Sequence, residues 1–575
     1  MTLPHWNLAP EQKPLQELLT RELEISALTA QVLINRGITN VDAAKRFLHP
    51  QLSELPDPFL LLNMQKAVDL TTAALADGKQ IAIFGDYDVD GVSSTALLTH
   101  FFRTLGAKPI SFIPHRLIDG YGMSKQGIDT LKAKGTDLII TVDNGIRSLE
   151  EIAYAKSCGL SVIVTDHHEP GDELPAADAI VNPKQAACPF PEKNICGCGV
   201  AFFFAMALRK RLREENFFTD HNEPHLAQYL DFVALGTVAD VMPLTGANRI
   251  FVHFGLKQLN QSSHLGLRAL ISTSDCKGKI TPTHVGFRLG PRINAAGRME
   301  SAQTALELFL SSQKENAYYL SGELERLNSL RQKTEEKILR GALHQLEDGS
   351  AEELAGITVF DASWHIGIAG IVASRLVDRF QVPSVVLAQE KETIRGSVRS
   401  PQGTNVLECL QACEHLLVQY GGHAQAAGVV IKEENIPAFK KLFEEVCAQK
   451  TKNTSLPKRN VDALVSPGIL TENIIQELEL LAPFGLGNPE PCFAVENIKL
   501  LRQSIVGKHH LKFQVKDEHT VTDAIAFGKA DHEENIHLPH HITYRPEINH
   551  FRGKSTIQLK IKELIALDIP AENLE

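Results

Sequence analysis

The segment Ile81-Ala-Ile-Phe-Gly-Asp-Tyr-Asp-Val-Asp-Gly91 decides the fold class of this chain. It joins a short apolar run to three carboxylates on alternate positions, Asp86, Asp88 and Asp90. Such a run is typical of a buried strand in a parallel sheet, and open α/β sheets place their sites at the carboxyl ends of the strands. Because alternate residues of an extended segment point the same way, these oxygens can converge on a cation.

The spacing alone leaves other interpretations open. Asp-x-Asp-x-Asp-Gly also begins the calcium loop of an EF-hand, although Leu97 stands where that loop has its bidentate Glu. A solvated turn that binds nothing is a further alternative.

The same pattern recurs further along the chain. Leu138 to Val142 precedes Asp143, and Val162 to Thr165 precedes Asp166-His167-His168. Helical patterns separate these apolar runs, which is the rhythm of βαβ units. The sequence therefore predicts an α/β fold with a parallel sheet.

Asp240 is a fourth candidate, because it follows Phe232 to Ala239, which we expect to be another strand end of this sheet. A lone Asp or His at such an end is usually a turn former or a cap. Several carboxylates gathered together are different, because they repel one another unless they are protonated or bind cations. Carboxylate and imidazole ligands suit Mn²⁺ and leave Mg²⁺ possible. Paired divalent ions roughly 3.5–4 Å apart recur in phosphodiester hydrolysis, so the residues favour that reaction.

The composition sets limits on the class of protein. The 575 residues are 43% hydrophobic, which predicts several folded domains. The net charge of −11 means that any nucleic-acid contact must be local. Among nine cysteines, the group Cys188, Cys196 and Cys198 lacks paired zinc-site spacing, so we expect reduced thiols, with a metal there as the alternative. We expect a cytoplasmic protein without a membrane span, because no stretch approaches about 20 apolar residues and Met1 to Pro10 has no signal-peptide pattern.

Helix and strand patterns divide the chain into five expected parts. Ser321 to Glu347 is rich in helix formers and predicts a long bridging helix, whereas Leu511 to Val515 and Ile557 to Ile561 alternate like strands of an antiparallel module. The parts are an N-terminal helical segment at 1–58, expected to be a separate cap, a parallel-sheet α/β domain at 59–320, the bridging helix at 321–348, a smaller α/β domain at 349–450 and an all-β module at 451–575.

The motifs together resemble the DHH phosphoesterase superfamily. The resemblance rests on Asp86-x-Asp-x-Asp-Gly91, a later Asp, Asp166-His167-His168, and Gly421-Gly-His-Ala-Gln-Ala-Ala-Gly428 in the position of the DHHA1 accessory domain. The bridging helix and the final β module resemble the single-stranded-DNA-specific 5′ exonucleases more than the shorter relatives. The resemblance implies DHH, DHHA1 and OB-type domains, and digestion of single-stranded DNA from 5′ to 3′ into mononucleotides in recombination and repair, including mismatch repair.

Carried over by motif, the resemblance implies roles for individual residues. Two divalent ions, Mn²⁺ or Mg²⁺, would be held by Asp88, Asp90, Asp143, His167 and Asp240. Asp86 and His168 would be catalytic, each as a further ligand or as a group that transfers protons and contacts phosphate. Ser397, Arg399 and His423 would contact the 5′ end of the strand, and Arg298 would contact its phosphates.

Other nucleic-acid contacts are expected from residue type. Arg116 offers a cation near Tyr121, whose ring can stack on a base, and Arg375 offers a second guanidinium; exposed turns are the alternative. Residues 499–516 contain five Lys or Arg and no Asp or Glu, which predicts strand contacts at Lys508 and Lys512, with Arg552 on a second edge. A solvated charged face is the alternative for this module.

Two other functions compete with the exonuclease. One is a phosphodiesterase of short oligonucleotides or cyclic dinucleotides, or a pyrophosphatase, against which the final β module argues. The other is a nucleic-acid-binding scaffold without chemistry, against which the complete set of acidic and histidine positions argues. The exonuclease resemblance also implies a helicase and a single-strand-binding protein as partners, and a cleft formed within one chain requires no dimer.

Overall fold

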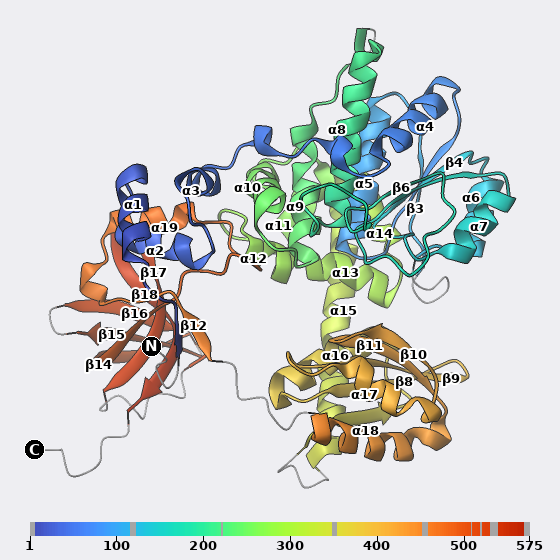
Figure 1. The fold of residues 1–575 in the computed structure, drawn as a ribbon. Helices are drawn as coiled ribbons and strands as arrows, with labels where there is room; N and C mark the ends of the chain where they lie inside the picture. Colours follow the sequence, from blue (N-terminus) through green and yellow to red (C-terminus); the bar gives the residue numbers. More distant parts are fainter. Residues whose placement is uncertain are drawn as a thin grey trace, which may run out of the picture.

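The computed structural model describes residues 6–115, 122–219, 222–347, 354–450, 458–507, 509–517, 520–529, 539–551 and 553–567. Two α/β domains lie one above the other, joined by a long helix, and a β module lies beside them (Figure 1). The predicted fold class is confirmed.

The first domain is built on a parallel sheet of order β3-β2-β4-β5-β6. The strands are β2 (Ile81–Phe84), β3 (Ile110–Phe112), β4 (Leu138–Val142), β5 (Ser161–Thr165) and β6 (Ala179–Val181). The helices around it are α4 (Met64–Ala76), α5 (Val89–Thr104), α6 (Lys125–Ala133), α7 (Leu149–Ser157) and α8 (Gly197–Glu214). Because all five strands run the same way, their carboxyl ends meet at one edge.

The expected strand at Phe232 to Ala239 was wrong, because this segment is part of helix α9 (Leu230–Ala239) and Asp240 caps its C-terminus. Residues 230–237 are buried on every side of the helix. A helix that is apolar all round has no periodicity to distinguish it from a buried strand. The remaining helices of this domain are α10 (Gly246–Leu259), α11 (Leu265–Thr273), α12 (Pro282–His284), the π-helical turn η5 (Val285–Leu289), α13 (Gly290–Met299) and α14 (Gln303–Leu310).

Helix α15 (Lys314–Glu347) is the predicted bridge and begins before the expected Ser321. It leads to the second α/β domain, whose mixed sheet has the order β10-β11-β9-β8-β7. The elements are β7 (Ile357–Asp361), α16 (Ile366–Phe380), β8 (Ser384–Glu390), β9 (Thr393–Arg399), α17 (Val406–Ala412), β10 (Leu417–His423), β11 (Ala426–Ile431) and α18 (Ile436–Lys450).

The C-terminal β module is a closed barrel of OB type. Its strands follow the order β14-β15-β16-β18-β17, and β14 also pairs with β17. They are β14 (Phe493–Val506), β15 (His510–Lys516), β16 (Val521–Ala526), β17 (His540–Phe551) and β18 (Lys554–Ala566). Buried residues alternate with outward ones along β15, where Leu511, Phe513 and Val515 point inward.

The N-terminal helices do not form a separate cap, because they share a hydrophobic core with this barrel. Strand β1 (Trp6–Leu8) pairs in parallel with β12 (Arg459–Val461). Helices α1 (Lys13–Leu23), α2 (Ala27–Asn35) and α3 (Val41–Leu48) pack against α19 (Glu472–Leu480) and the barrel, in one cluster that contains Leu33 and Leu481. The first and last parts of the chain therefore form one structural unit.

Arg249 of α10 fastens this unit to the first α/β domain. Its side chain is buried, and it donates hydrogen bonds to the carbonyls of Phe47 at 2.8 Å, Leu481 at 2.8 Å, Leu480 at 3.1 Å and Ala482 at 3.0 Å. The guanidinium also lies 3.7 Å from the centre of the Phe47 ring. One side chain thus contacts both the N-terminal helices and the segment that leads into the barrel.

The nine cysteines are free thiols. Within the described ranges, no helix combines the length and the apolar character that crossing a bilayer requires.

We predict that Arg249→Met lowers the free energy of unfolding by about 2–4 kcal/mol, because four carbonyls lose a charged donor. Calorimetry should show the barrel and the N-terminal helices melting at a lower temperature than the α/β domains. Arg268→Met is the control, since Arg268 is an exposed arginine on α11, and equal melting of the two variants would contradict the role of Arg249.

Candidate metal and nucleic-acid site

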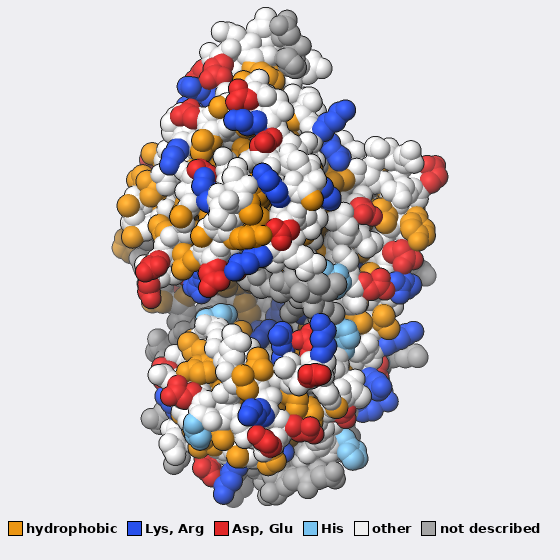
Figure 2. Space-filling model, turned by 90° about the vertical axis from the view of Figure 1, so that its right-hand side faces the viewer, with side chains coloured by type: hydrophobic (Ala, Val, Ile, Leu, Met, Phe, Trp, Pro, Cys, Tyr) orange, Lys and Arg blue, Asp and Glu red, His pale blue; other side chains and the backbone are white. Residues whose placement is uncertain are grey.

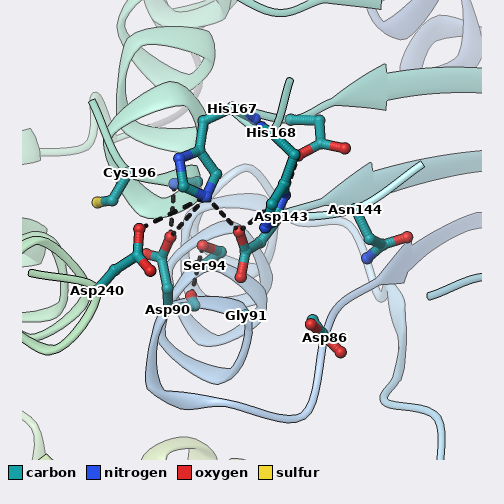
Figure 3. A network of polar contacts seen from close by, with 12 residues as sticks. Asp86, Asp90, Gly91, Ser94, Asp143, Asn144, His167, His168, Cys196 and Asp240 are labelled. Atoms are coloured by element: carbon teal, nitrogen blue, oxygen red, sulfur yellow. Dashed lines mark hydrogen bonds and ion pairs between the residues drawn. The ribbon is translucent and has the colours of Figure 1, made fainter. Parts of the chain in front are cut away.

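The carboxyl edge of the parallel sheet gathers the predicted acidic and histidine residues (Figure 3). Asp88 caps the N-terminus of α5, where it accepts a hydrogen bond from the Gly91 N–H, and Asp90 lies in the first turn of that helix. Asp143 follows β4 in a left-handed conformation with φ of 63°, and His167 follows β5. Asp240 reaches the same place from the end of α9, so a helix supplies what we expected from a strand.

His167 lies at the centre of this cluster. Its Nε2 atom is 3.0 Å from Asp143 Oδ1, 3.6 Å from Asp240 Oδ2 and 3.8 Å from Asp90 Oδ2. The potential ligand atoms form three overlapping groups, each within 4.8 Å: Asp143, His167 and His168; Asp90, His167 and Asp240; and Asp86, Asp88 and Asp143. All seven predicted metal and catalytic residues therefore belong to one constellation.

Two oxygens of the cluster are acceptors without a donor. Asp143 Oδ1 and Asp240 Oδ2 are buried and receive no hydrogen bond, since the nearby His167 nitrogen does not approach in hydrogen-bonding geometry. Asp143 is only 1% exposed, and although the Asp240 side chain is 28% exposed, its Oδ2 atom is itself buried. Buried oxygens of this kind fit divalent cations, which supply the missing positive charge.

The pKa values in the cluster follow from burial and crowding. Burial, and then neighbouring carboxylates, raise the pKa of Asp90 to about 6 and that of Asp240 to about 8, and raise that of Asp143 well above its usual value. Burial and the adjacent His168 lower the pKa of His167 to about 3, so its imidazole is neutral. A divalent ion can displace the protons from these carboxyl groups and bind the carboxylates together with the neutral imidazole.

Asp166 bonds the backbone of His167 and the ring of His168, a role that we did not predict although the residue stands in the motif. Its Oδ1 accepts from the N–H of His167 at 2.7 Å and from His168 Nδ1 at 2.8 Å, and its Oδ2 accepts from the Ile146 N–H at 2.9 Å. Burial opposes ionisation, but the His168 bond and charge outweigh it and lower the pKa of Asp166. Burial opposes protonation of His168, but its hydrogen bond to Asp166 and the charge of that carboxylate raise the pKa of His168 to about 9. His168 is therefore a cation at neutral pH.

The N-terminus of α8 holds Asp90 in place. The Gly197 N–H donates to Asp90 Oδ2 at 2.6 Å, and the Cys198 N–H donates to Asp90 Oδ1 at 2.9 Å. A β-carbon at Gly197 would lie 2.6 Å from that of Asp143, and one at Gly236 would lie 2.2 Å from Asp90 Oδ1. These glycines were missed because their requirement arises from helix packing, which leaves no local pattern in the sequence.

The cysteines near this edge have packing contacts. Cys196 Sγ accepts from the Gly199 N–H at 3.3 Å, and burial raises the pKa values of Cys196 and Cys198 well above their usual range. Cys188 lies apart from these two, and its Sγ accepts a hydrogen bond from the Leu62 N–H.

A second face with predicted contacts lies on the mixed sheet. The register aligns Ser397 with Gly428 and Gly421, and aligns Arg399 with Ala426 and His423, so Ser397, Arg399 and His423 share one side. A cavity of about 530 Å³ opens beside Ser397 and Gly421. Figure 2 shows the surface hollowed between the two α/β domains, with cationic side chains on the lower rim.

Arg298 connects this second domain to the first, because its Nη1 donates to the Gly367 carbonyl at the start of α16 at 3.2 Å. Arg375 is less directly placed, since its Nε bonds Glu335 of α15 at 3.1 Å. Arg116, Tyr121, Lys508 and Arg552 lie outside the described residues.

Three cationic side chains lie in register across the barrel, and one of them, Arg545, is paired with Glu490. Strand register aligns Lys512 of β15, Ile525 of β16, Lys560 of β18 and Arg545 of β17. Beside the row, the Phe527 ring is 49% exposed, with Lys560 Nζ 5.3 Å from its centre and the His510 ring 5.0 Å away. Phe527 and Lys560 were not predicted, because the partners of each strand are not legible in the sequence.

Comparison with known proteins supports the resemblance to the DHH superfamily. Residues 80–237 match the DHH family N-terminal domain, residues 353–449 match the DHHA1 domain, and residues 461–563 match the RecJ OB domain. The chain is 38% identical to the single-stranded-DNA-specific exonuclease RecJ of Bacillus subtilis, over 97% of this chain and 70% of that protein. It is 36% identical to RecJ of Escherichia coli, over 94% and 96%.

A solved structure resembles the whole fold. The crystal structure of RecJ from Thermus thermophilus in complex with Mn²⁺ matches with a TM-score of 0.82 and 33% identity, over 98% of this chain and 80% of that one. The roles of the individual site residues stay predictions.

We predict that Gly236→Ala lowers activity at least about 10-fold, because a β-carbon that meets Asp90 displaces it. Gly322→Ala on α15 is the control, since nothing lies within 4 Å of its added carbon and alanine favours a helix by roughly 1 kcal/mol. Full activity of the Gly236 variant, measured by nuclease assay beside thermal melting, would contradict the packing argument.

We also predict that the stabilisation by Mn²⁺ increases with pH. The raised pKa values of Asp90 and Asp240 keep protons on the folded protein that the unfolded chain loses, so these groups destabilise the metal-free protein as pH rises from about 4 to about 8. Mn²⁺ must displace those protons at low pH. The melting temperature should be measured with Mn²⁺ and with chelator between about pH 6 and about pH 9. The difference between the two should increase with pH, and a constant difference would refute the linkage.

Proposed function

The chain belongs to the RecJ family of exonucleases, and on this premise we propose that it hydrolyses single-stranded DNA from the 5′ end into mononucleotides with two divalent metal ions, Mn²⁺ or Mg²⁺. The observation that carries the proposal is the buried carboxylate and imidazole cluster, with acceptors that lack a donor, at the carboxyl edge of the parallel sheet.

The ions would be held by Asp88, Asp90, Asp143, His167 and Asp240, with Asp86 beside them. When bound, they would supply the Lewis-acid chemistry that activates water and neutralises charge on the phosphodiester. The protein helps to position these ligands, because the N-terminus of α8 bonds the Asp90 carboxylate and Asp166 bonds the backbone N–H of His167.

His168 and the second α/β domain would act on the nucleic acid directly. His168, kept cationic by Asp166, would contact the scissile phosphate or protonate the departing oxygen. Ser397, Arg399 and His423 on one sheet face, with Arg298 at the domain junction, would hold the terminal 5′ phosphate. Arg375, whose side chain is 57% exposed while its Nε bonds Glu335, would contact the strand through the rest of its guanidinium.

We propose further that the enzyme works in the cytoplasm in DNA recombination and repair, including mismatch repair. Single strands in a cell arise when a helicase unwinds a duplex and are covered by single-strand-binding protein, so both are proposed partners. A monomer suffices, because one chain supplies both the acidic cluster and the cationic sheet face.

The experiment that tests the function is digestion of a single-stranded oligonucleotide labelled at either end, with Mn²⁺, Mg²⁺ or chelator, beside the same sequence as a blunt duplex. We expect metal-dependent release of mononucleotides from the 5′ end of the single strand alone. Digestion restricted to fragments of a few nucleotides would favour the short-oligonucleotide phosphodiesterase, and release from the 3′ end would overturn the polarity.

In the same assay, we predict that Asp143→Asn lowers the rate at least about 100-fold, because a central ligand oxygen is lost. The matched control is Asp137→Asn. Asp137 lies directly before β4, whereas Asp143 lies directly after it. The Asp137 carboxylate accepts a hydrogen bond from the Gln80 N–H at 2.8 Å. This variant should keep its activity, and equal losses in both would indicate a folding defect.

We predict that Phe527→Ala raises KM for long strands roughly fivefold or more, because a stacked base is lost, and leaves trinucleotide cleavage unchanged. Val521→Ala, an exposed change at the other end of β16, is the control. Point changes are preferable to deletion of the barrel, which would strip α1 to α3 of their core. An equal effect on long strands and on trinucleotides would contradict the proposal that the barrel contacts only the part of the strand that is distant from the acidic cluster.

A further inference from the structure

The first turn of helix α5 contains a backbone donor that the helix itself cannot satisfy. The N–H of Val89 is the first of α5, so no carbonyl lies one turn earlier to accept its hydrogen bond, and Val89 is buried. Asn294 of α13 supplies the acceptor, because its Oδ1 accepts from this N–H at 3.1 Å. Val89 stands between Asp88 and Asp90, two of the predicted metal ligands. The bond therefore acts on the segment that carries both carboxylates.

Helix α13 also packs closely against the segments that carry the ligands. A β-carbon at Gly297 would lie 2.9 Å from the carbonyl oxygen of Tyr87, so the helix approaches the backbone of this segment directly. A β-carbon at Gly290 would lie 3.8 Å from the side chains of both Val89 and Ala239. Ala239 directly precedes a further predicted ligand at the end of α9. One helix thus touches both of the helix ends that deliver predicted ligands.

The other side of α13 is itself fixed. It lies in the part of the first domain that faces the second domain, beside α15 (Figure 1). Arg292 Nε bonds Glu325 of α15 at 2.5 Å, and Arg298 Nη1 donates to the Gly367 carbonyl at 3.2 Å. Asn294 lies between these two arginines, so the amide is carried by a helix that is held at both of its ends.

From these contacts we infer that Asn294 is a positioning residue for the metal site, which fixes the segment from Asp88 to Asp90 through the N–H of Val89. The inference rests on the proposed function, because it concerns the ions that this function requires. Asp88 belongs to one group of potential ligand atoms and Asp90 to another. A shift of the bond between them would therefore change how the two groups lie relative to each other.

An amide is suited to this position. Its oxygen is neutral, so it accepts the hydrogen bond without adding charge to a cluster of carboxylates. Because the backbone N–H can only donate, the acceptor must be the amide oxygen, which fixes the orientation of the Asn294 side chain. Partners that orient metal ligands without touching the ion commonly change metal affinity by about 10–100-fold. The alternative is a bond that only stabilises the packing of α13 on α5, and this alternative predicts no change in metal affinity.

The test is the binding of Mn²⁺ to the full-length protein, measured by isothermal titration calorimetry without DNA. Asn294→Leu has nearly the shape of asparagine but no acceptor, and we expect it to bind Mn²⁺ at least about tenfold more weakly than the wild type. Asn294→Ala, which adds no bulk, carries the same prediction. Asn294→Asp keeps the acceptor and should bind Mn²⁺ at least as tightly as the wild type.

Asn260→Leu is the matched control, because it removes a bond of the same kind in the same domain. Asn260 Oδ1 accepts from the N–H of the buried Ile280 at 2.9 Å, and its Nδ2 donates to the Leu256 carbonyl at 2.6 Å. Asn260 follows the C-terminus of α10, whereas the loop after Asp240 leads into the N-terminus of that helix, about 20 Å away. This variant should melt at a lower temperature and keep its Mn²⁺ affinity within about twofold.

Equal Mn²⁺ affinities of the wild type and Asn294→Leu, or the same loss in Asn260→Leu, would overturn the positioning role. Digestion of DNA by the wild type would still uphold the proposed function in that case. A wild-type protein that binds no Mn²⁺ would overturn both. In the nuclease assay, the Mn²⁺ concentration for half-maximal digestion should increase in Asn294→Leu by the same factor as the affinity falls, and an unchanged midpoint would contradict the inference.

Discussion

Asp90 and Asp143 place carboxylates where almost no water reaches them, and this buried negative charge constrains the rest of the first domain. Such a cluster is unfavourable unless protons, dipoles or cations compensate it. The structure supplies part of the compensation through the N-terminus of α8, and the raised pKa values of Asp90 and Asp240 supply another part as bound protons. Two buried acceptors still lack a donor, and these oxygens are available to bind metal ions.

The sequence contained most of this edge in legible form. Apolar runs that stop at Asp86, Asp143 and His167 predicted parallel strand ends, because strand burial and the polar site lie next to each other along the chain. Asp240 was found for a partly wrong reason, since α9 is buried all round and shows no helical period. Gly197 and Gly236 could not be predicted, because the carboxylate that excludes a side chain at each position is distant in sequence. It is more than fifty residues away for Gly197 and more than a hundred for Gly236.

The barrel shows the same division between local and distant information. Alternation along β15 predicted an antiparallel strand, and the family resemblance predicted its OB type. The cationic row of Lys512, Lys560 and Arg545 depends on which strands pair, which the alternation does not specify. The partnership between the N-terminal helices and the barrel was equally hidden, because helix amphipathicity indicates a buried face but not what covers it.

That partnership has a consequence for how the protein is made. The N-terminal helices emerge from the ribosome first, yet the strands that complete their core are synthesised last, after both α/β domains. The apolar faces of α1 to α3 must remain uncovered throughout the translation of the intervening domains. The shared core of the N-terminal helices and the barrel can therefore close only after the barrel strands have been made.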